Sequence, residues 1–273
     1  MSKEIHVDDY DPKLLAMLEL IWGEGFLSPG GPAAVDEIVH GLDLAGKLVI
    51  DIGSGLGGVD MHLARKHGAR VIGLEIEAPL IELAKARVAA AGLSDRIELR
   101  HCMLGPLALA DQSVDVVFSK DSLIHEEDKV GAFAEYFRVL EPGGWLAMSD
   151  WMRSDQPYSK DMEYRFEMEG LTYHMWPLDA YGTALKETGF VDISLVDTSG
   201  DYRGLCDREY ALMQGELKAE MTGTLGNESY EHFLENWRAM TVVLHKGELR
   251  TGRIRARTPE PESHHVSTKS KRP

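Results

Sequence analysis

Short apolar runs alternate with stretches of helical periodicity along the first half of the chain. The apolar runs, several of them rich in β-branched residues, predict strands at 47–52, 70–75, 96–100, 114–118 and 145–149. Helices are expected between them: one begins near Val59, one runs through Leu80 and Val88, and one covers 128–140 and stops at the turn residues 141–144. Strands that alternate with helices indicate a mostly parallel sheet of the α/β class, with helices on both faces.

Further elements are expected around this core. In chain order they are an amphipathic helix over 11–24, a mainly helical stretch over 157–188 that ends at Gly189, a strand over 193–197, two helices within 207–245 separated near 223–227, and a last strand over 253–257. No internal repeat is evident.

The composition is that of a globular protein, with 44% hydrophobic and 27% charged residues in a chain of 273. No apolar run approaches the ~18 residues that a transmembrane helix needs, and the N-terminal residues have no apolar stretch typical of a secretory signal. The two cysteines, Cys102 and Cys206, are far apart and indicate no disulfide framework. We therefore expect a cytoplasmic protein that is a monomer or a weak dimer and has no membrane partner.

The formal charge of −16 is unevenly distributed. Residues 246–273 contain 8 Lys+Arg and 3 Asp+Glu, a surplus of +5, so residues 1–245 carry −21. A part of the chain with this negative charge repels nucleic acid and suits a small cationic or neutral substrate. The acidity could also serve solubility alone.

The strongest chemical signal follows the first predicted strand, in the segment IDIGSGLGG over 50–58. Glycines at the carboxyl end of a strand let a ligand approach the backbone, and the next helix presents its N-terminus there. Asp51 precedes these glycines, and Glu75 ends the next strand, 22 residues after Gly53. An acidic side chain at that position can accept hydrogen bonds from both hydroxyls of a ribose. The alternative is a structural strand–turn–helix unit without a ligand.

The spacing of these glycines resembles motif I of the class I S-adenosylmethionine-dependent methyltransferases, whose fold is Rossmann-like. The resemblance covers about residues 30–200 and implies S-adenosylmethionine as the cofactor, with no metal. It assigns the amino-acid end of the cofactor to Asp51, Gly53, Gly55 and Gly57, and the ribose to Glu75. The adenine is assigned to Ile76, Met103 and the Leu104 amide, and Ser28 and Ser119 are further cofactor-binding residues. Met103 stands where the family commonly has an aspartate.

Two further segments resemble the phosphoethanolamine N-methyltransferases over nearly the whole chain, about 10–258. They read LIWGEGFLSPGG at 20–31 and FSKDSLIH at 118–125. The resemblance implies that His125 pairs with Tyr10, that this pair closes a lid over the substrate, and that Asp121 orients the amine. A histidine suits proton removal from an ammonium near neutral pH. Sarcosine and dimethylglycine methyltransferases are neighbouring families.

The segments that hold the phosphate in that family differ here. Trp151 follows Ser149-Asp150 in place of a tyrosine, Leu171 replaces an arginine two residues before Tyr173, and Ala239-Met240 stand in the lysine region. Arg153, Arg165 or Arg203 could compensate. The predicted substrate walls are Trp22, Trp151, Tyr173 and Trp176, which suit a methylated ammonium through cation–π contacts.

The sequence therefore predicts a methyltransferase that acts on the nitrogen of a small amine. One alternative is S- or O-methylation of a small metabolite on the same scaffold, and another is a cofactor-binding module without catalysis. The predicted organisation is an N-terminal lid helix over 1–30, a methyltransferase core over 31–200, C-terminal helices and the last strand over 201–257, and a disordered tail over 258–273.

Overall fold

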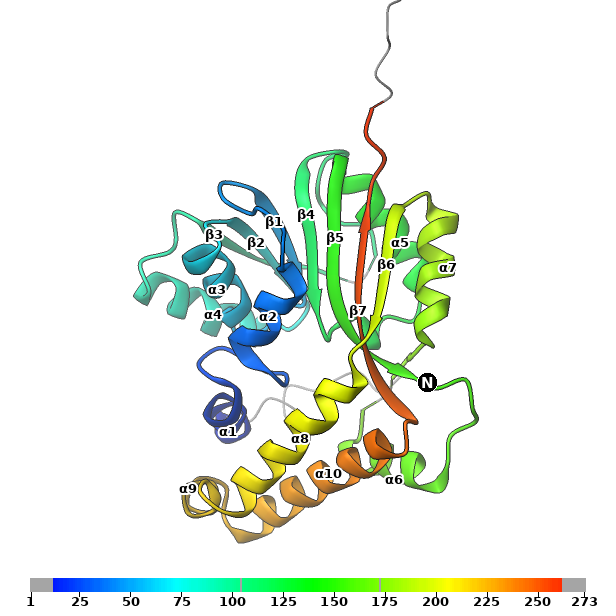
Figure 1. Ribbon diagram of the computed structural model, residues 1–273. Helices are drawn as coiled ribbons and strands as arrows, with labels where there is room; N and C mark the ends of the chain where they lie inside the picture. Colours follow the sequence, from blue (N-terminus) through cyan, green and yellow to red (C-terminus); the bar gives the residue numbers. More distant parts are fainter. Residues whose placement is uncertain (1–11, 104, 172, 262–273) are drawn as a thin grey trace, which may run out of the picture.

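The computed structural model describes residues 12–103, 105–171 and 173–261 (Figure 1). These residues form a seven-stranded sheet in the order β3-β2-β1-β4-β5-β7-β6. The strands are β1 (Leu48–Ile52), β2 (Arg70–Glu75), β3 (Ile97–His101), β4 (Val114–Lys120), β5 (Leu140–Arg153), β6 (Val191–Asp197) and β7 (Leu249–Arg257). In this sheet β7 is antiparallel to β5 and β6, and the remaining pairs of strands are parallel. The predicted mostly parallel α/β fold is confirmed.

Helices cover both faces of the sheet. One face carries α2 (Gly31–Val39), α3 (Gly58–Lys66) and α4 (Ala78–Ala90), and the other carries α5 (Lys129–Val139) and α7 (Leu178–Thr188). Successive residues of a strand point to opposite faces, so Val49 of β1 packs into the first core and Ile50 into the second. This alternation explains why the strands read as continuous apolar runs in the sequence.

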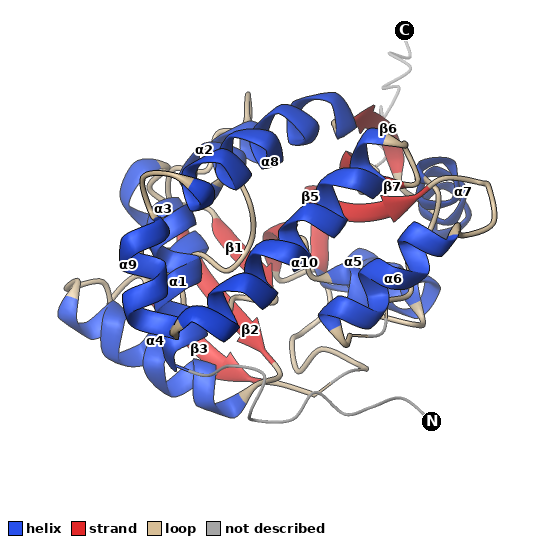
Figure 2. Ribbon diagram, turned by 90° about the horizontal axis from the view of Figure 1, so that it is seen from below, coloured by secondary structure: helices blue, strands red, loops and turns tan. Residues whose placement is uncertain are grey.

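The remaining helices gather beyond the carboxyl ends of the parallel strands, below the sheet in Figure 1 and facing the viewer in Figure 2. They are α1 (Pro12–Trp22), α6 (Lys160–Glu169), α8 (Ser199–Gln214), α9 (Lys218–Leu225) and α10 (Asn227–His245). Helix α10 lies against α6, α8 and α9, and α1 lies against α9. Ligands bind in open α/β sheets at this edge, so the helical layer covers the expected site.

Helix α1 is attached to the glycine loop region by an apolar contact and an ion pair. Leu15 packs with Leu56 and Leu80. Arg87 of α4 donates to both carboxylate oxygens of Glu19, with an Nη2–Oε2 distance of 3.0 Å, and Oε1 of Glu19 also accepts from the Gly25 amide at 2.6 Å. The N-terminal helix is therefore held over the carboxyl edge, as a lid requires.

The structure corrects the expected turn at 141–144. These residues belong to β5, where they form a bulge: Val114 pairs with Leu140, but Val116 pairs with Trp145. Gly143 has a φ of 78°, which a glycine adopts without strain, and the Gly143 amide donates to Pro259 O at 3.2 Å. A Pro-Gly-Gly run reads locally as a turn, whereas the paired strands on either side keep it in the sheet.

The helical predictions are confirmed in part. Helix α2 lies where no helix is predicted, and Pro32 occupies its first turn, where proline is tolerated. The segment 157–188 is mainly helical as predicted: it forms α6 and α7, separated by a non-helical stretch, and Gly189 caps the end of α7. The described residues form three helices from Ser199 onward, where two were expected over 207–245.

The predicted tail begins inside the folded part of the chain. Thr258 is buried and donates from its amide to Gly144 O at 3.0 Å, whereas residues 262–273 lie outside the described residues.

Within the described part of the chain, no helix combines the length and the apolar character needed to cross a membrane.

Gly58 at the start of α3 permits a close backbone contact, which gives a first prediction. A Cβ on Gly58 would lie 2.5 Å from the Gly25 carbonyl carbon, so Gly58→Ala forces two backbone segments apart. We expect the free energy of unfolding to fall by about 1–3 kcal/mol in urea titrations. The matched control is Gly223→Ala in α9, where a Cβ meets nothing within 4 Å and where higher helix propensity should add up to ~1 kcal/mol. Equal effects at the two sites would contradict the close contact.

Candidate functional site

A cavity of about 490 Å³ opens at the carboxyl edge of β1, β2 and β4, a volume typical of small-molecule sites. Its wall includes eight residues that the sequence predicts for the site: Ser28, Gly53, Gly55, Glu75, Ile76, Met103, Asp121 and His125. Asp51, Gly57 and Ser119 lie outside the lining, and Leu104 and Tyr10 lie outside the described residues. The topology thus brings six of the predicted cofactor residues, together with Asp121 and His125, to one cavity.

The glycine loop follows β1 and forms one side of the cavity. Gly53 has a φ of 79°, and a Cβ there would lie 2.5 Å from Cβ of Ser122. The Ser122 hydroxyl donates to Ile52 O at 2.7 Å and shares a hydrogen bond with the Ser119 hydroxyl. Ser119 therefore supports the loop from behind, and Gly53 allows β1 and the end of β4 to approach.

Glu75 ends β2 and is almost fully buried. Its Oε2 accepts from the Gly55 amide at 2.8 Å, and its Oε1 accepts from the amides of Ile76 and Glu77 at 2.8 and 3.0 Å. A carboxylate offers about four acceptor positions, and three are used by backbone amides. Glu75 thus holds the glycine loop in place, and one acceptor position remains free within the described structure. To accept hydrogen bonds from both hydroxyls of a ribose, Oε2 of Glu75 would have to lose its hydrogen bond from the Gly55 amide.

Two apolar side chains stand accessible at the cavity edge. Ile76 is 36% exposed and Met103 is 75% exposed, although both line the cavity. Their segments are joined where Nε2 of His101 lies 2.9 Å from Ile76 O. Two accessible apolar groups at a cavity edge suit a flat aromatic ring such as an adenine.

A buried acidic cluster lies behind the glycine loop. Asp51 and Asp60 are both fully buried, and neither Asp60 oxygen nor Oδ2 of Asp51 has a hydrogen-bond partner in another described residue. Burial raises the pKa of Asp51 well above its ordinary value, and the nearby Asp60 and Glu75 carboxylates raise it further. Burial likewise raises the pKa of Asp60 to about 8. The sequence reading missed Asp60, since an aspartate in a helical pattern carries no local sign of burial.

The raised pKa of Asp60 predicts a pH-dependent stability. The unfolded chain loses this proton near pH 4, but the folded chain keeps it up to about pH 8. The free energy of unfolding should therefore fall as the pH rises from 4 to 8, by up to ~1.4 kcal/mol per pH unit. In Asp60→Asn the group cannot ionise, and urea titrations across this range should show a smaller fall. Parallel pH profiles for the two proteins would mean that Asp60 does not retain its proton.

A buried ion pair forms the floor on the β4 side. Nζ of Lys120 lies 2.8 Å from Oδ2 of Asp121 and also contacts the Ser28 hydroxyl. The hydroxyl of Ser149 donates to Oδ1 of Asp121 at 2.9 Å. Asp121 has a φ of 58°, a strained conformation for a residue other than glycine that recurs at functional sites. Lys120 was quoted in the sequence motif but not predicted as a site residue.

His125 lies in a short 3-10 helix, η2 (Leu123–His125), that two buried charged groups hold in place. Oδ1 of Asp150 accepts from the Ile124 amide at 3.0 Å, and its Oδ2 accepts from the Tyr181 hydroxyl at 2.5 Å. Nζ of the fully buried Lys129 donates to Leu123 O and, at 2.7 Å, to Glu126 O. Burial raises the pKa of Asp150 to about 7 and lowers the pKa of Lys129. Asp150 and Lys129 thus hold the backbone segment that bears the His125 imidazole, and no local sequence pattern indicated either contact.

Three of the four predicted substrate walls share one apolar cluster. Trp22 belongs to the large core that includes the α2–α4 face, Trp151 and Tyr173 pack against that core, and the Tyr173 ring lies 5.5 Å from the His125 ring. The structure places Trp176 apart from them: it belongs to the core on the other face, 5.7 Å from the Tyr181 ring. None of the four predicted substrate walls is in the lining of the cavity.

Glu209 of α8 adds a carboxylate to this region. It accepts from Trp22 Nε1 at 2.9 Å, and its Oε2 has no hydrogen-bond partner among the described residues. Burial raises the pKa of Glu209 to about 7, although the Trp22 hydrogen bond and the Lys120 charge lower it. The sequence reading missed Glu209, which lies 187 residues from Trp22.

The segments that hold the phosphate in the resembled family place apolar side chains here, and the arginines that could replace the missing charges contact other groups. Ala239 and Met240 are buried. The three arginines that could compensate face other groups: Arg165 pairs with Glu169 and donates to Asn236 at 2.8 Å, Arg153 lies 5.4 Å from the Tyr158 ring centre, and Arg203 lies near the Asp197 carboxylate. Of these three arginines, Arg165 is therefore paired with a carboxylate and Arg203 lies near one, while Arg153 contacts an aromatic ring.

Comparisons with known proteins agree with this fold. Residues 50–148 match a family described as a methyltransferase domain. Phosphoethanolamine N-methyltransferase 1 of Arabidopsis thaliana is 31% identical over 81% of this chain and 44% of its own length. The chain spans about half the length of the first curated relatives it matches.

Two other comparisons cover more than nine tenths of this chain. The 27-O-demethylrifamycin SV methyltransferase of Amycolatopsis mediterranei is 26% identical over 94% of this chain and 93% of its own. The structure of Haemonchus contortus phosphoethanolamine N-methyltransferase 2 in complex with S-adenosyl-L-methionine aligns with a TM-score of 0.87 at 22% identity, over 93% of this chain and 59% of that one.

Proposed function

We propose that this chain, which contains a domain of the class I S-adenosylmethionine-dependent methyltransferases, methylates the nitrogen of a small amine that carries no phosphate. The observation that supports the acceptor class most directly is that Asp121 and His125 share the cavity wall and that the Tyr173 ring lies 5.5 Å from the His125 ring. A cation suits such walls through charge and cation–π contacts, whereas a phosphate would lack paired guanidinium groups.

The cofactor residues follow from the cavity wall. Glu75 holds the ribose, Ile76 and Met103 pack on the adenine, and Gly53 and Gly55 border the amino-acid end. Bound S-adenosylmethionine supplies a methyl group on a positively charged sulfur. Asp51 lies behind the lining, so it acts on the amino-acid end through the glycine loop.

His125 and Asp121 carry the acceptor chemistry in this proposal. An ammonium cannot attack, because its nitrogen has no lone pair. Asp121 orients the ammonium, and His125 accepts its proton, which exposes the lone pair toward the methyl carbon. The new N–C bond forms as the C–S bond breaks, and the positive charge passes from sulfur to nitrogen. Asp150 and Lys129 keep the imidazole in position, and α1 helps to exclude water.

O-methylation of a larger hydroxyl compound is the second candidate. It is favoured by the rifamycin-related relative, which matches nearly the full length of both chains. In that reaction His125 would accept a hydroxyl proton.

A competition experiment distinguishes the acceptors. The protein is incubated with S-adenosylmethionine and equal concentrations of phosphoethanolamine, mono- and dimethylated amines, glycine derivatives, a thiol and a phenol, and the products are resolved by mass spectrometry. We expect an amine without phosphate to be methylated at least tenfold faster than phosphoethanolamine, a difference of ~1.4 kcal/mol. The opposite preference would show that arginines elsewhere rebuild the phosphate site, and methyl ethers or thioethers would favour the second candidate.

A gain-of-function variant provides the matched control. Trp151→Tyr combined with Leu171→Arg restores two groups of the phosphate clamp. We expect this variant to use phosphoethanolamine better than the parent does, with the cofactor affinity unchanged.

A further inference from the structure

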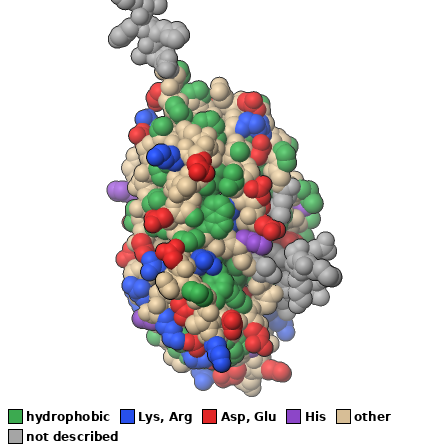
Figure 3. Space-filling model, turned by 90° about the vertical axis from the view of Figure 1, so that its right-hand side faces the viewer, with side chains coloured by type: hydrophobic (Ala, Val, Ile, Leu, Met, Phe, Trp, Pro, Cys, Tyr) green, Lys and Arg blue, Asp and Glu red, His purple; other side chains and the backbone are tan. Residues whose placement is uncertain are grey.

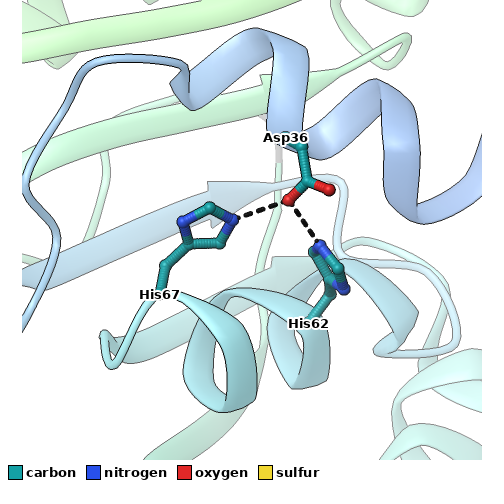
Figure 4. Close-up of side chains that lie close together, drawn as sticks. All are labelled: Asp36, His62 and His67. Carbon is teal, nitrogen blue, oxygen red and sulfur yellow. Dashed lines mark hydrogen bonds and ion pairs between the residues drawn. The ribbon is translucent and has the colours of Figure 1, made fainter.

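Two histidines and an aspartate converge on the outer side of α2 and α3, away from the cofactor cavity. Asp36 lies on α2, His62 lies on α3, and His67 directly follows α3. Nε2 of His62 and Nε2 of His67 each lie 2.8 Å from the same oxygen, Oδ1 of Asp36 (Figure 4). The three ligand-type atoms lie within 4.8 Å of one another.

The chemistry of this set fits a divalent transition metal ion. Zn²⁺ binds imidazole nitrogen and carboxylate oxygen at about 2.0–2.2 Å, commonly in tetrahedral geometry. Two ligand atoms at that distance from a tetrahedral ion lie about 3.4 Å from each other. Each Nε2 atom now lies 2.8 Å from Oδ1 of Asp36, so the separation has to grow by only about 0.6 Å to admit an ion. The hydrogen on each neutral imidazole then resides on Nδ1, and Nε2 presents its lone pair.

Lys66 supplies the second observation, because it orients the carboxylate. Its Nζ lies 2.6 Å from Oδ2 of Asp36, which leaves Oδ1 directed at the two rings. The carboxylate is therefore held with one oxygen toward the rings, in the way that hydrogen-bonding partners orient the ligands of metal sites.

The site is also accessible. The side chains of His62, His67 and Asp36 are 17%, 20% and 29% exposed. An ion can therefore enter from solvent, and water can complete the coordination.

We propose that Asp36, His62 and His67 form a binding site for a divalent transition metal ion, with Zn²⁺ as the best-fitting ion. The ion would join α2 to α3. Helix α2 follows the segment that carries Ser28, and α3 follows the glycine loop, so the ion would fix together two helices that begin at the cofactor cavity. An ion that binds only the folded chain stabilises it by mass action.

Zinc titration by calorimetry tests the proposal. The parent protein carries His264→Ala and His265→Ala, which remove the adjacent histidines of the C-terminal segment as adventitious ligands, and is first stripped with a chelator. We expect one Zn²⁺ per chain, a rise in the melting temperature with added Zn²⁺, and tetrahedral Co²⁺ absorption bands when Co²⁺ replaces Zn²⁺.

The variants are His62→Gln and His67→Gln, which keep an N–H donor for Asp36 and so preserve the fold. Each should weaken Zn²⁺ binding by at least about tenfold and abolish the Co²⁺ bands. The matched control is His245→Gln, since Nε2 of His245 also pairs with an aspartate, Asp207, at 2.9 Å but without a second histidine. Absence of Zn²⁺ binding in the parent, or undiminished binding in the His62→Gln/His67→Gln double variant, would overturn the proposal.

Discussion

Replacing His125 by alanine should lower turnover by about 10²–10⁴-fold, the usual contribution of a positioned general base, and leave cofactor affinity nearly unchanged. The imidazole lies in the cavity wall and its ring faces Tyr173, while the groups assigned to the cofactor come from β1, β2 and the loop after β3. Loss of the imidazole therefore removes the proton acceptor and not the cofactor contacts. Single-turnover rates with a confirmed acceptor and calorimetric cofactor affinities measure the two effects separately.

The control for this variant is His232→Ala, on an exposed position of α10. A second readout is the pH profile: without the imidazole the acceptor must lose its proton to solvent, so turnover of His125→Ala should fall more steeply than that of the unsubstituted protein as the pH is lowered, and should recover in part at alkaline pH. Tyr10→Phe should be milder, since it keeps the aromatic ring. Full turnover in His125→Ala would mean that the histidine is structural and that acceptors bind already deprotonated.

Replacing Glu75 by alanine should weaken S-adenosylmethionine binding by about 2–4 kcal/mol, from the loss of charge-assisted hydrogen bonds, or about 30- to 700-fold. Part of the effect is indirect, because Glu75 also accepts from the Gly55, Ile76 and Glu77 amides. Calorimetric titration with S-adenosylmethionine and with its demethylated product measures the loss.

Glu75→Gln separates the two contributions, since it keeps one acceptor oxygen for the loop and loses the charge; its affinity should lie between those of the parent and Glu75→Ala. Glu82→Ala is the control, because Glu82 is an exposed residue of α4 that pairs only with Lys85 in the described structure. Unchanged affinity in Glu75→Ala would overturn the assignment of the ribose site.

Acidic and basic side chains are mixed on the face of the molecule that Figure 3 draws. On the described part of the face in Figure 3, acidic and basic side chains are interspersed, and no continuous basic band crosses it. A band of that kind is the usual footprint of a nucleic-acid-binding protein. Absence of nucleic-acid binding and the cytoplasmic location remain predictions.

The strands and the glycine loop could be predicted from the sequence because they depend on local patterns. A strand buried on both faces needs a continuous apolar run, and β1, β2 and β4 all show one. The position of Gly53 follows from the requirement for a positive φ at a close approach. Since parallel strands end at one edge, the run of strands also predicted that Gly53, Glu75 and His125 would meet.

The bulge in β5 and the helix α2 could not be predicted in this way. Residues 141–144 have turn chemistry, but pairing of the flanking residues with β4 and β7 keeps them in the sheet. Gly31 and Pro32 resemble a loop, but Val35, Ile38 and Val39 find an apolar face to cover. In both places, packing against distant residues overrides the local preference.

By itself, the sequence determined the α/β sheet, the cofactor edge and the residues at the strand ends, because each is encoded within a few neighbouring positions. Only the tertiary structure decided which polar groups meet across the chain. Asp150 supports the helix of His125, Glu209 reaches Trp22, and His62 and His67 meet Asp36 from another helix. The physical reason is that burial and hydrogen-bond partners depend on how elements pack, and no local periodicity records that packing.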